Sequence, residues 1–411
     1  MEDKAIRKGL SVTAIVLIVI SCLLISFNDA HEKLFGREST LYGIPFIFAF
    51  AIPLIAILIV LTRYYNNTDT MDEMIGAVAV RYSIFGWLFV FVMRLAGAVF
   101  TAFFLDFYTS HSTLIYLLTN SFNVCVICTL CVALALKGLP KTKIEKKRLK
   151  FKQLFLLIMM MYGMAQIGSM MGMPLEMALS LPVAFAPSDG NALAGLQNSL
   201  LLTDHTLIRI ITIGILPPIF EELIFRKFLI DRTIRHGEFI SCAMSGIMFG
   251  LWHGNFQQFF YAFFVGVLFA FVYIRTGNVI YTMILHASMN LVTSSVTIEL
   301  LAAFMKRAGI NFDTGTIDPG IDEEVLLQAI IPIFLLIMLW VFILFGFQVA
   351  GFILLIVKRK NFKLVAREGE PGRKIILHKM THSVAMWVFF TFALLRFITY
   401  YLPDFLALFF W

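Results

Sequence analysis

The stretch VLLQAIIPIFLLIMLWVFILFGFQVAGFILLIV, residues 325–357, contains no charged side chain. About 20 consecutive apolar residues are enough for a helix to cross the hydrocarbon core of a bilayer. We therefore expect this stretch to span a membrane. It is also long enough to contain a break or a re-entrant turn.

Apolar runs of this kind recur along the whole chain. Of the 411 residues, 60% are hydrophobic and 14% are charged, whereas soluble domains have about 45–50% apolar and about 25% charged residues. Alternating strands of the kind found in outer-membrane barrels are absent. The runs, each bounded by charged or turn residues, fall at 10–27, 41–62, 83–105, 114–136, 154–173, 206–231, 238–253, 257–275, 278–301, 325–357 and 383–402. They predict an all-α fold, a polytopic transmembrane helical bundle of about eleven spans.

The basic residues between these runs predict the orientation of the chain. When alternate loops are assigned to opposite sides, 26 Lys and Arg residues fall on the side of the N-terminus, four on the other side and three within spans. Cytoplasmic loops retain positive charge, so we predict a cytoplasmic N-terminus and an outer C-terminus. The net charge of +7 has its explanation in topology, and we expect no nucleic-acid partner.

The chain shows no internal repeat and no likeness between its two halves. We divide it into N-terminal transmembrane helices with a basic cytoplasmic loop (1–153), a membrane core (154–301), and an acidic outer loop with C-terminal transmembrane helices (302–411). The acidic residues between Asp313 and Glu324 are interpreted as a solvated loop.

Ionisable residues inside spans are candidates for function, because burying a charge in a bilayer is costly. The run 206–231 contains PPIFEELIFR at residues 217–226. Glu222 and Arg226 are four residues apart and can pair on one helix face, whereas Glu221 points about 100° away and has no basic partner at that spacing. Glu221 is therefore the freer carboxylate, suited to act as a general base or acid. The alternative is that both acids only pair with Arg226 and Lys227.

Two later spans supply further polar residues, in FGLWH at 249–253 and HASMN at 286–290. His286 and Asn290 are four residues apart, so both can face one cavity, as ligand or base and as amide donor to an oxyanion. Helix rises place these residues and Glu221 at similar depths, while His253 comes out deeper unless its helix begins later. A shared intramembrane site is therefore feasible.

Three further charged residues fall inside spans. Arg209 lies near a predicted outer end, where we expect it to extend toward the membrane surface. Arg94 and Arg396 could pair with a substrate terminus or with Asp106 and Asp404.

The ordered motifs resemble those of the CAAX protease and bacteriocin-processing family of intramembrane proteases, known as CPBP or Abi. The resemblance covers residues 205–295 and rests on Glu221-Glu222-x-x-x-Arg226, Phe249-x-x-x-His253 and His286-x-x-x-Asn290. It implies that Glu221 and His253 activate a water, and that His286 and Asn290 hold the tetrahedral oxyanion. It leaves Glu222 and Arg226 as a supporting pair that fixes the helix or engages a substrate carboxylate.

The resemblance leaves the cofactor open. Glu221, His253 and His286 could furnish three ligands for Zn with an open water position. The compact H-E-x-x-H arrangement on one helix is missing, however, and no further His or Asp clearly serves as a second shell. We favour a water-activating site without an obligatory metal.

We expect a multi-pass endopeptidase of a bacterial plasma membrane, whose partners are membrane lipids and a peptide or lipidated protein substrate. The family includes enzymes that trim prenylated C-terminal tails and others linked to peptide or bacteriocin maturation, and the sequence fits either. The rival hypotheses are a non-catalytic bacteriocin-immunity or scaffold protein and a proton-coupled transporter that uses Glu221, Glu222 and His253 as a relay.

Overall fold

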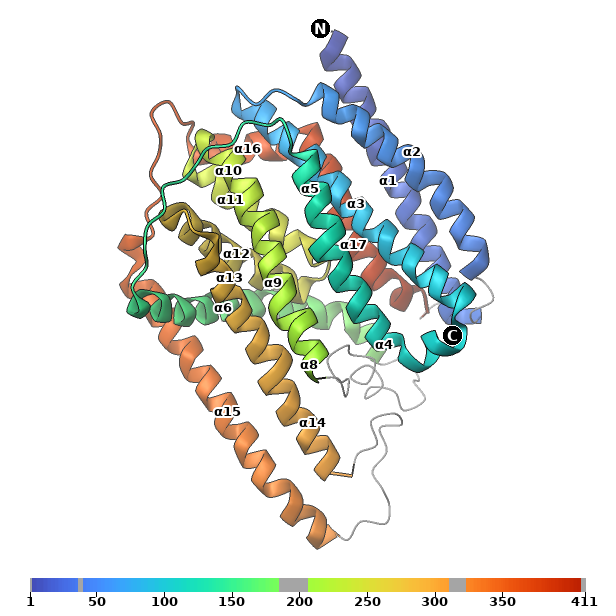
Figure 1. The fold of residues 1–411 in the computed structure, drawn as a ribbon, viewed down its shortest axis with the longest axis vertical. Coiled ribbons are helices and arrows are strands. Elements are labelled where there is room, and N and C mark those ends of the chain that lie inside the picture. The colour runs from blue at the N-terminus through green and yellow to red at the C-terminus, as the bar shows by residue number, and fades with distance from the viewer. Residues whose placement is uncertain (1, 36–39, 185–205, 310–322, 408–411) are drawn as a thin grey trace.

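The computed structural model describes residues 2–35, 40–184, 206–309 and 323–407, and within these ranges the chain contains helices and no strand (Figure 1). Each predicted apolar run falls in one helix or in consecutive helices. The all-α class is therefore confirmed for the described residues. The predicted acidic loop lies largely outside them, as do the side chains of Arg94 and Asp404.

The α-helices are named in chain order. They are α1 (Glu2–Phe35), α2 (Thr40–Tyr64), α3 (Met71–Phe103), α4 (Leu105–Phe122), α5 (Thr129–Ala135), α6 (Phe151–Ala184), α8 (Thr206–Arg209), α9 (Leu216–Glu222), α10 (Leu229–Thr233), α11 (Glu238–Trp252), α12 (Phe256–Thr276), α13 (Val279–Leu291), α14 (Ile298–Arg307), α15 (Glu323–Val357), α16 (Arg373–His382) and α17 (Val384–Ala407). Four π-helical segments join some of them into longer rods: η2 (Asn123–Cys128), η3 (Ile210–Ile215), η4 (Leu223–Phe228) and η6 (Val292–Thr297).

The predicted number of spans is only partly supported. Within the described residues, six helices are long and apolar enough to cross a membrane, or seven if α16 and α17, bent by 72°, count as one span. The polytopic helical class is thereby supported, with fewer spans meeting this criterion among the described residues than the eleven predicted. The run at 238–253 forms a helix of 15 residues, which is short for a bilayer. The run at 206–231 lies in consecutive helical segments, residues 206–233, which we call the motif rod and which carry several charges. The run at 325–357 lies in one continuous helix, without a re-entrant turn.

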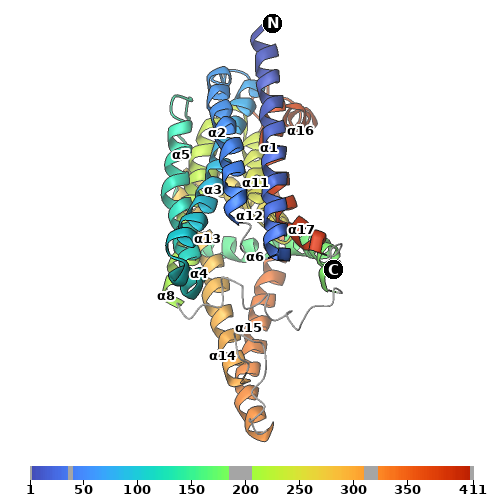
Figure 2. The same cartoon turned by 90° about the vertical axis from the view of Figure 1, so that its right-hand side faces the viewer.

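Helix α6 crosses the other helices instead of running along them, and α14 and α15 project beyond the rest of the bundle (Figures 1 and 2). Glycines allow the crossing. A Cβ on Gly163 would lie 2.5 Å from the backbone nitrogen of Phe352 in α15, and a Cβ on Gly168 would meet the backbone of Tyr261 in α12 at 2.5 Å or less. Close backbone approach at small residues is a common way for membrane helices to pack.

Short turns fix α12, which follows the second motif, and α13, which carries the third. Asn255 caps α12 by accepting a hydrogen bond from the backbone of Gln258, and Asn278 caps α13 in the same way. Between them, Gly277 adopts φ 57°, the left-handed conformation that ends many helices. The turn from α12 to α13 is therefore specified locally by Gly277-Asn278.

The main hydrophobic core is shared by the N-terminal and C-terminal parts of the chain. Buried residues of α1, α2 and α3 lie in the same cluster as residues of the motif rod, α11 and α17. Tyr82 and Phe85 of α3 pack against Phe225 of the motif rod, with ring centroids 6.1 and 6.2 Å away. The N-terminal helices thus form part of the structure that supports the motif residues.

Candidate active site

The first motif lies on the motif rod, residues 206–233, in which the α-helical segment α9 is flanked by the π-helical segments η3 and η4, with α8 and α10 at the two ends. Pro217 and Pro218 begin α9 and have no N–H to donate. In a helix the carbonyl of Ile213 pairs with the residue four or five positions later, which is Pro217 or Pro218. The carbonyl of Thr212 lies five positions before Pro217, and both carbonyls therefore need donors from elsewhere. A π-helical turn contains one extra residue and is frequent at functional sites.

Two side chains from other helices satisfy these carbonyls. The hydroxyl of Ser121 in α4 donates to the carbonyl of Thr212 at 2.9 Å. The amide nitrogen of Asn290 in α13 donates to the carbonyl of Ile213 at 3.0 Å. The first motif is thereby held to the third, and both are held to the N-terminal region.

The second π-helical segment is held in the same way. The hydroxyl of Tyr82 donates to the carbonyl of Ile224 at 2.5 Å, and that of Ser245 donates to the carbonyl of Phe225 at 2.9 Å. Tyr82 and Ser245 are both buried. The turn that carries Glu221 and Glu222 is therefore anchored on each side by side chains from neighbouring helices.

The predicted pair of Glu222 and Arg226 is confirmed. The two side chains are fully buried, and Oε1 of Glu222 lies 3.1 Å from Nη1 of Arg226. The guanidinium lies 4.2 Å from the ring centre of Phe249 and 5.2 Å from that of Phe269. Cation–π contact with both rings adds to the attraction of the carboxylate in this dry environment.

Glu222 also orients His286, a contact that the sequence did not predict. Nδ1 of His286 lies 3.0 Å from Oε1 of Glu222, so a carboxylate at Glu222 accepts a hydrogen bond from Nδ1–H. The other ring nitrogen, Nε2, lies 3.9 Å from Oε2 of Glu221. This distance is too long for a direct hydrogen bond. His286 therefore connects the two adjacent glutamates, one through each ring nitrogen.

His253 lies directly after α11, at its C-cap. Its Nδ1 lies 3.0 Å from the carbonyl of Phe249, and because a carbonyl only accepts, Nδ1 carries the proton. The neutral ring then has an unprotonated Nε2 that can accept a proton. The ring of His253 is 5.0 Å from that of Phe249 and 6.4 Å from that of Tyr261.

The ring of Phe249 brings the three motifs together. His253 and His286 contact it at centroid distances of 5.0 and 5.6 Å, and Arg226 lies over its face. Asn290 lies one helical turn beyond His286 and binds the carbonyl of Ile213. The residues predicted from the sequence thus lie in one region of the structure, with Phe249 at its centre.

The possible zinc ligands do not form a metal site in this arrangement. Among the described residues, no group of three or more His, Cys, Asp or Glu side chains is placed to hold a metal ion. Nδ1 of His286 is bound to Glu222, which leaves Nε2, 3.9 Å from Oε2 of Glu221, as the ring nitrogen that could bind a ligand. We therefore assign no step of the chemistry to a metal.

Arg209 differs from the sequence-based expectation, and Arg396 makes a contact that the sequence did not predict. Arg209 does not extend toward the membrane surface: it is buried and forms an ion pair with Glu299 of α14. Arg396 donates to the carbonyl of Trp252, next to His253, and its guanidinium lies 5.0 Å from the centre of the Trp252 ring. Arg396 is thus placed beside the second motif, where no sequence pattern had put it.

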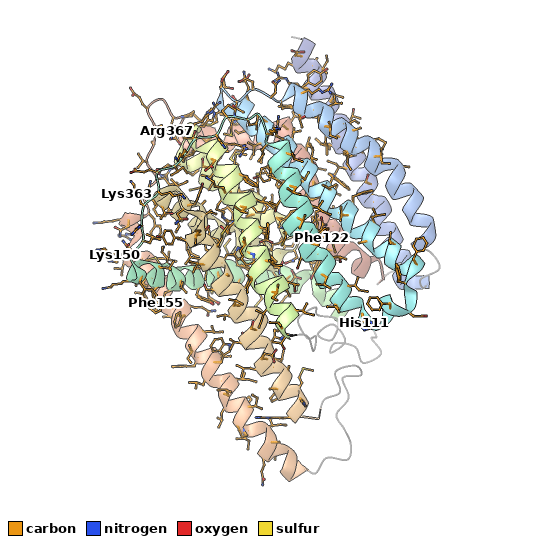
Figure 3. The ribbon with its side chains drawn as sticks, viewed as in Figure 1. His111, Phe122, Lys150, Phe155, Lys363 and Arg367 are labelled. Atoms are coloured by element: carbon orange, nitrogen blue, oxygen red, sulfur yellow. The ribbon has the colours of Figure 1, made fainter. Side chains whose placement is uncertain are left out.

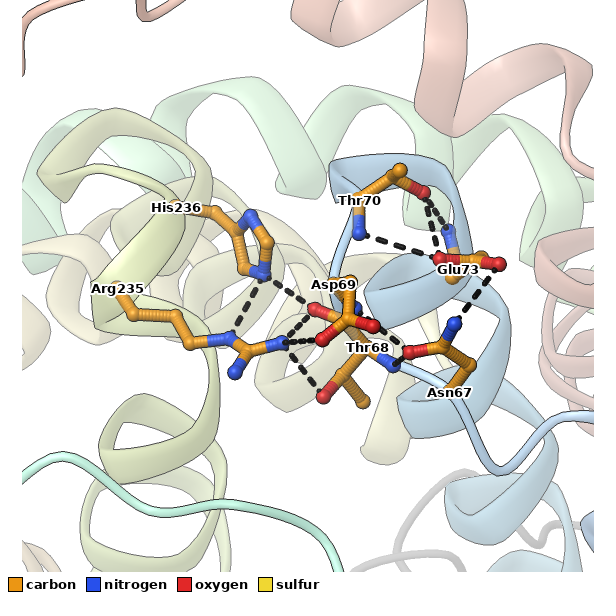
Figure 4. A network of polar contacts seen from close by, with 7 residues as sticks. All are labelled: Asn67, Thr68, Asp69, Thr70, Glu73, Arg235 and His236. Carbon is orange, nitrogen blue, oxygen red and sulfur yellow. Dashed lines mark hydrogen bonds and ion pairs between the residues drawn. The ribbon is translucent and has the colours of Figure 1, made fainter.

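The C-terminal end of the motif rod is fixed by a polar network (Figure 4). Arg235 donates to the carbonyl and hydroxyl of Thr68, in the loop between α2 and α3, and to Nε2 of His236 at 3.0 Å. Burial lowers the pKa of His236, and the positive charges of Arg235 and Arg367 lower it further. The Thr68 carbonyl and Asp69 act in the opposite direction and raise this pKa. The lowered pKa favours the neutral form of His236, whose Nε2 also lies 2.9 Å from the Thr68 carbonyl.

Residues 203–292 match the family model described as Rce1-like, type II CAAX prenyl endopeptidase. This segment is an Rce1-like domain of the CPBP family. The resemblance predicted for residues 205–295 is confirmed. No curated protein and no solved structure matches the chain.

The Rce1-like domain contains all three motifs, but it does not contain all the residues that hold them. Ser121 and Tyr82, which bind carbonyls of the motif rod, precede the domain, and Arg396 follows it. Sequence reasoning missed Ser121 and Tyr82 because an isolated hydroxyl in an apolar run carries no pattern. The paired prolines did carry a signal, since they require two outside donors.

Proposed function

We propose that this protein is an intramembrane endopeptidase that hydrolyses a peptide bond in a lipidated C-terminal tail or another membrane-bound peptide. The Rce1-like domain supports a peptidase. The observation that carries the proposal is the buried contact of His286 with Glu221 and Glu222, from separate helices. Burying ionisable side chains in an apolar setting is costly, and such groups inside membrane proteins therefore usually mark functional sites.

In this proposal Glu221 is the general base. It is the member of the glutamate pair that makes no ion pair with Arg226, whereas Glu222 is engaged by both Arg226 and His286. Glu221 takes a proton from water as the oxygen attacks the carbonyl carbon of the scissile bond. His253 assists by accepting a hydrogen bond from the same water at its unprotonated Nε2.

His286 and Asn290 stabilise the negative charge that forms on the carbonyl oxygen. His286 does so with a proton on both ring nitrogens, donating from Nε2–H while Nδ1–H stays bound to Glu222. The separation of 3.9 Å between Nε2 of His286 and Oε2 of Glu221 is that of two groups that can both bind one oxygen atom lying between them. The amide of Asn290 has a second N–H, beyond the one bound to Ile213. Donors of this kind stabilise a tetrahedral oxyanion most effectively where water is excluded.

The tetrahedral intermediate then collapses. The C–N bond breaks, the carbonyl re-forms, and Glu221 passes the proton it took from water to the departing amine. The products are a carboxylic acid and an amine, which exchange a proton to give a carboxylate and an ammonium group, so that one water molecule is consumed for each bond broken. Glu222 does not touch the substrate in this scheme. It positions His286 by accepting a hydrogen bond from Nδ1–H, while Arg226 lies 3.1 Å from the same carboxylate oxygen.

The test is cleavage of quenched fluorescent peptides, prenylated and unprenylated, by purified protein in detergent. Glu221→Gln should lose at least about 100-fold in activity, the usual contribution of a general base. Glu222→Gln should lose less, because the amide can still accept from His286. The control is Glu299→Gln, which removes an ion-paired carboxylate that lies beside Arg209 and should leave activity unchanged.

Each variant is assayed with and without a chelator, which tests metal dependence separately from the role of Glu221. Equal activity in wild type and Glu221→Gln would refute the proposed base. Proton-coupled uptake into liposomes without cleavage of any peptide would favour the transporter hypothesis instead.

A further inference from the structure

The N-terminal end of α6 and the C-terminal end of α15 meet in a corner at the edge of the molecule. The two helices cross at Gly163 and Gly351, where a Cβ on Gly351 would clash with the backbone of Met159. One basic loop precedes α6, and another basic loop follows α15. Phe362, in the loop after α15, packs on the same apolar cluster as Leu149 and Leu154. The two loops are therefore held together.

The corner has a large excess of positive charge, although Glu145, directly before it, pairs with Lys147 at 3.8 Å. Residues 146–175 and 325–367 contain ten Lys and Arg residues and no Asp or Glu. Every one of the ten side chains is exposed: Lys146, Lys147, Arg148, Lys150, Lys152, Lys358, Arg359, Lys360, Lys363 and Arg367. Figure 3 shows Lys150, Lys363 and Arg367 along one edge of the molecule.

Exposed apolar side chains lie next to these charges. Phe151, between Lys150 and Lys152, is 84% exposed, and Val357, directly before Lys358, is 65% exposed. Phe155 is 44% exposed, and its ring lies 6.1 Å from that of Phe347 on α15. The corner thus combines a cationic rim with an apolar surface on both helices.

We propose that this corner binds an anionic glycerophospholipid. Lys150, Lys152, Lys358 and Lys360 attract the phosphate of the headgroup, and the acyl chains lie along the exposed faces of α6 and α15. The general excess of positive charge in cytoplasmic loops does not account for this arrangement, because that rule needs neither a dense basic cluster from two separate loops nor adjoining exposed aromatic residues. Basic pockets between membrane helices on the cytoplasmic side are typical sites for anionic headgroups. A free anion would use the cations alone, whereas a lipid also uses Phe151 and Phe155.

The experiment compares two variants of the full-length protein, each with four charges removed. The test variant is Lys150→Gln, Lys152→Gln, Lys358→Gln and Lys360→Gln. The control variant is Lys137→Gln, Lys141→Gln, Lys143→Gln and Lys374→Gln, four exposed basic residues that lie outside the corner on the same predicted side. Protein in detergent is titrated with phosphatidylglycerol, phosphatidylcholine or inorganic phosphate. Bound lipid is counted by native mass spectrometry, and the melting temperature is recorded.

Wild type and the control variant should retain phosphatidylglycerol and melt at a higher temperature with it than with phosphatidylcholine. The test variant should bind phosphatidylglycerol at least about tenfold more weakly, since each cation near a headgroup contributes to the attraction. A second variant, Phe151→Ser with Phe155→Ser, should also weaken lipid binding while its charge is unchanged.

Equal loss of binding in the test and control variants would overturn the proposal, because it would show a dependence on net charge alone. The same stabilisation by inorganic phosphate as by phosphatidylglycerol would overturn it as well. Retention of the lipid by the test variant would place the site elsewhere.

Discussion

The hydrogen bond from Asn290 to the carbonyl of Ile213 should compensate for the N–H that Pro217 lacks. Asn290→Ala removes the donor and leaves this carbonyl without a partner, because Pro217 and Pro218 follow at the positions from which a helix would pair it. Pro217→Ala restores a backbone N–H that can reach the same carbonyl. The two substitutions should therefore be coupled.

The size of the coupling follows from the cost of an unpaired carbonyl. Leaving a buried polar group unsatisfied costs about 1–3 kcal/mol, while side-chain hydrogen bonds measured within a membrane protein average about 0.6 kcal/mol and reach about 1.7 kcal/mol. The Ile213 side chain is partly buried, so we expect Asn290→Ala to lower the free energy of unfolding by about 1 kcal/mol. In the Pro217→Ala background the same substitution should cost less than half of that.

The assay is unfolding of purified protein in mixed micelles by increasing fractions of a denaturing detergent, followed by tryptophan fluorescence. The double-mutant cycle compares wild type, each single variant and the double variant. Ser245→Ala is the comparison for specificity, since it also leaves one carbonyl, that of Phe225, without its donor, but its cost should not change when Pro217 is replaced. An equal cost of Asn290→Ala in both backgrounds would refute the reasoning.

Two further predictions concern packing and pH. Gly351→Leu should lower the melting temperature, because its side chain would clash with the backbone of Met159, whereas Gly346→Leu, with open space around it, should not; equal melting temperatures for the two variants would contradict the proposed crossing. Burial lowers the pKa of His236 below its usual value near 6.5, so the folded state binds fewer protons than the unfolded state and stability should fall as the pH drops through about 6.5. Melting curves between pH 5.5 and 7.5 should show a smaller loss for His236→Gln than for wild type, and identical pH dependence would argue against this role.

The sequence was most informative where a pattern has a direct physical cause. The spacing of Glu222 and Arg226 predicts one helix face, and the structure places the two charges 3.1 Å apart. The same geometry identified Glu221 as the carboxylate without an arginine partner. The three motifs also indicated the resemblance to the family, and the match of residues 203–292 to the family model confirms it.

The number of spans was less predictable from apolar runs, because hydrophobic residues fill both membrane spans and protein cores. The run at 238–253 is apolar because it is buried: ten residues of α11 are inaccessible to solvent. The run at 206–231 is a rod interrupted by two π-helical segments, held by side chains from its neighbours. Hydropathy alone does not distinguish these cases from a simple spanning helix.

The sequence alone thus determined the helical class, the charge pattern of the loops and the residues with chemical potential, since these depend on local composition and on spacing along one helix. Only the tertiary structure decided that His286 lies between Glu221 and Glu222, that Phe249 unites the three motifs, and that Ser121 and Asn290 serve the carbonyls before Pro217. Those contacts join helices far apart in the chain, and their distances depend on how the helices pack.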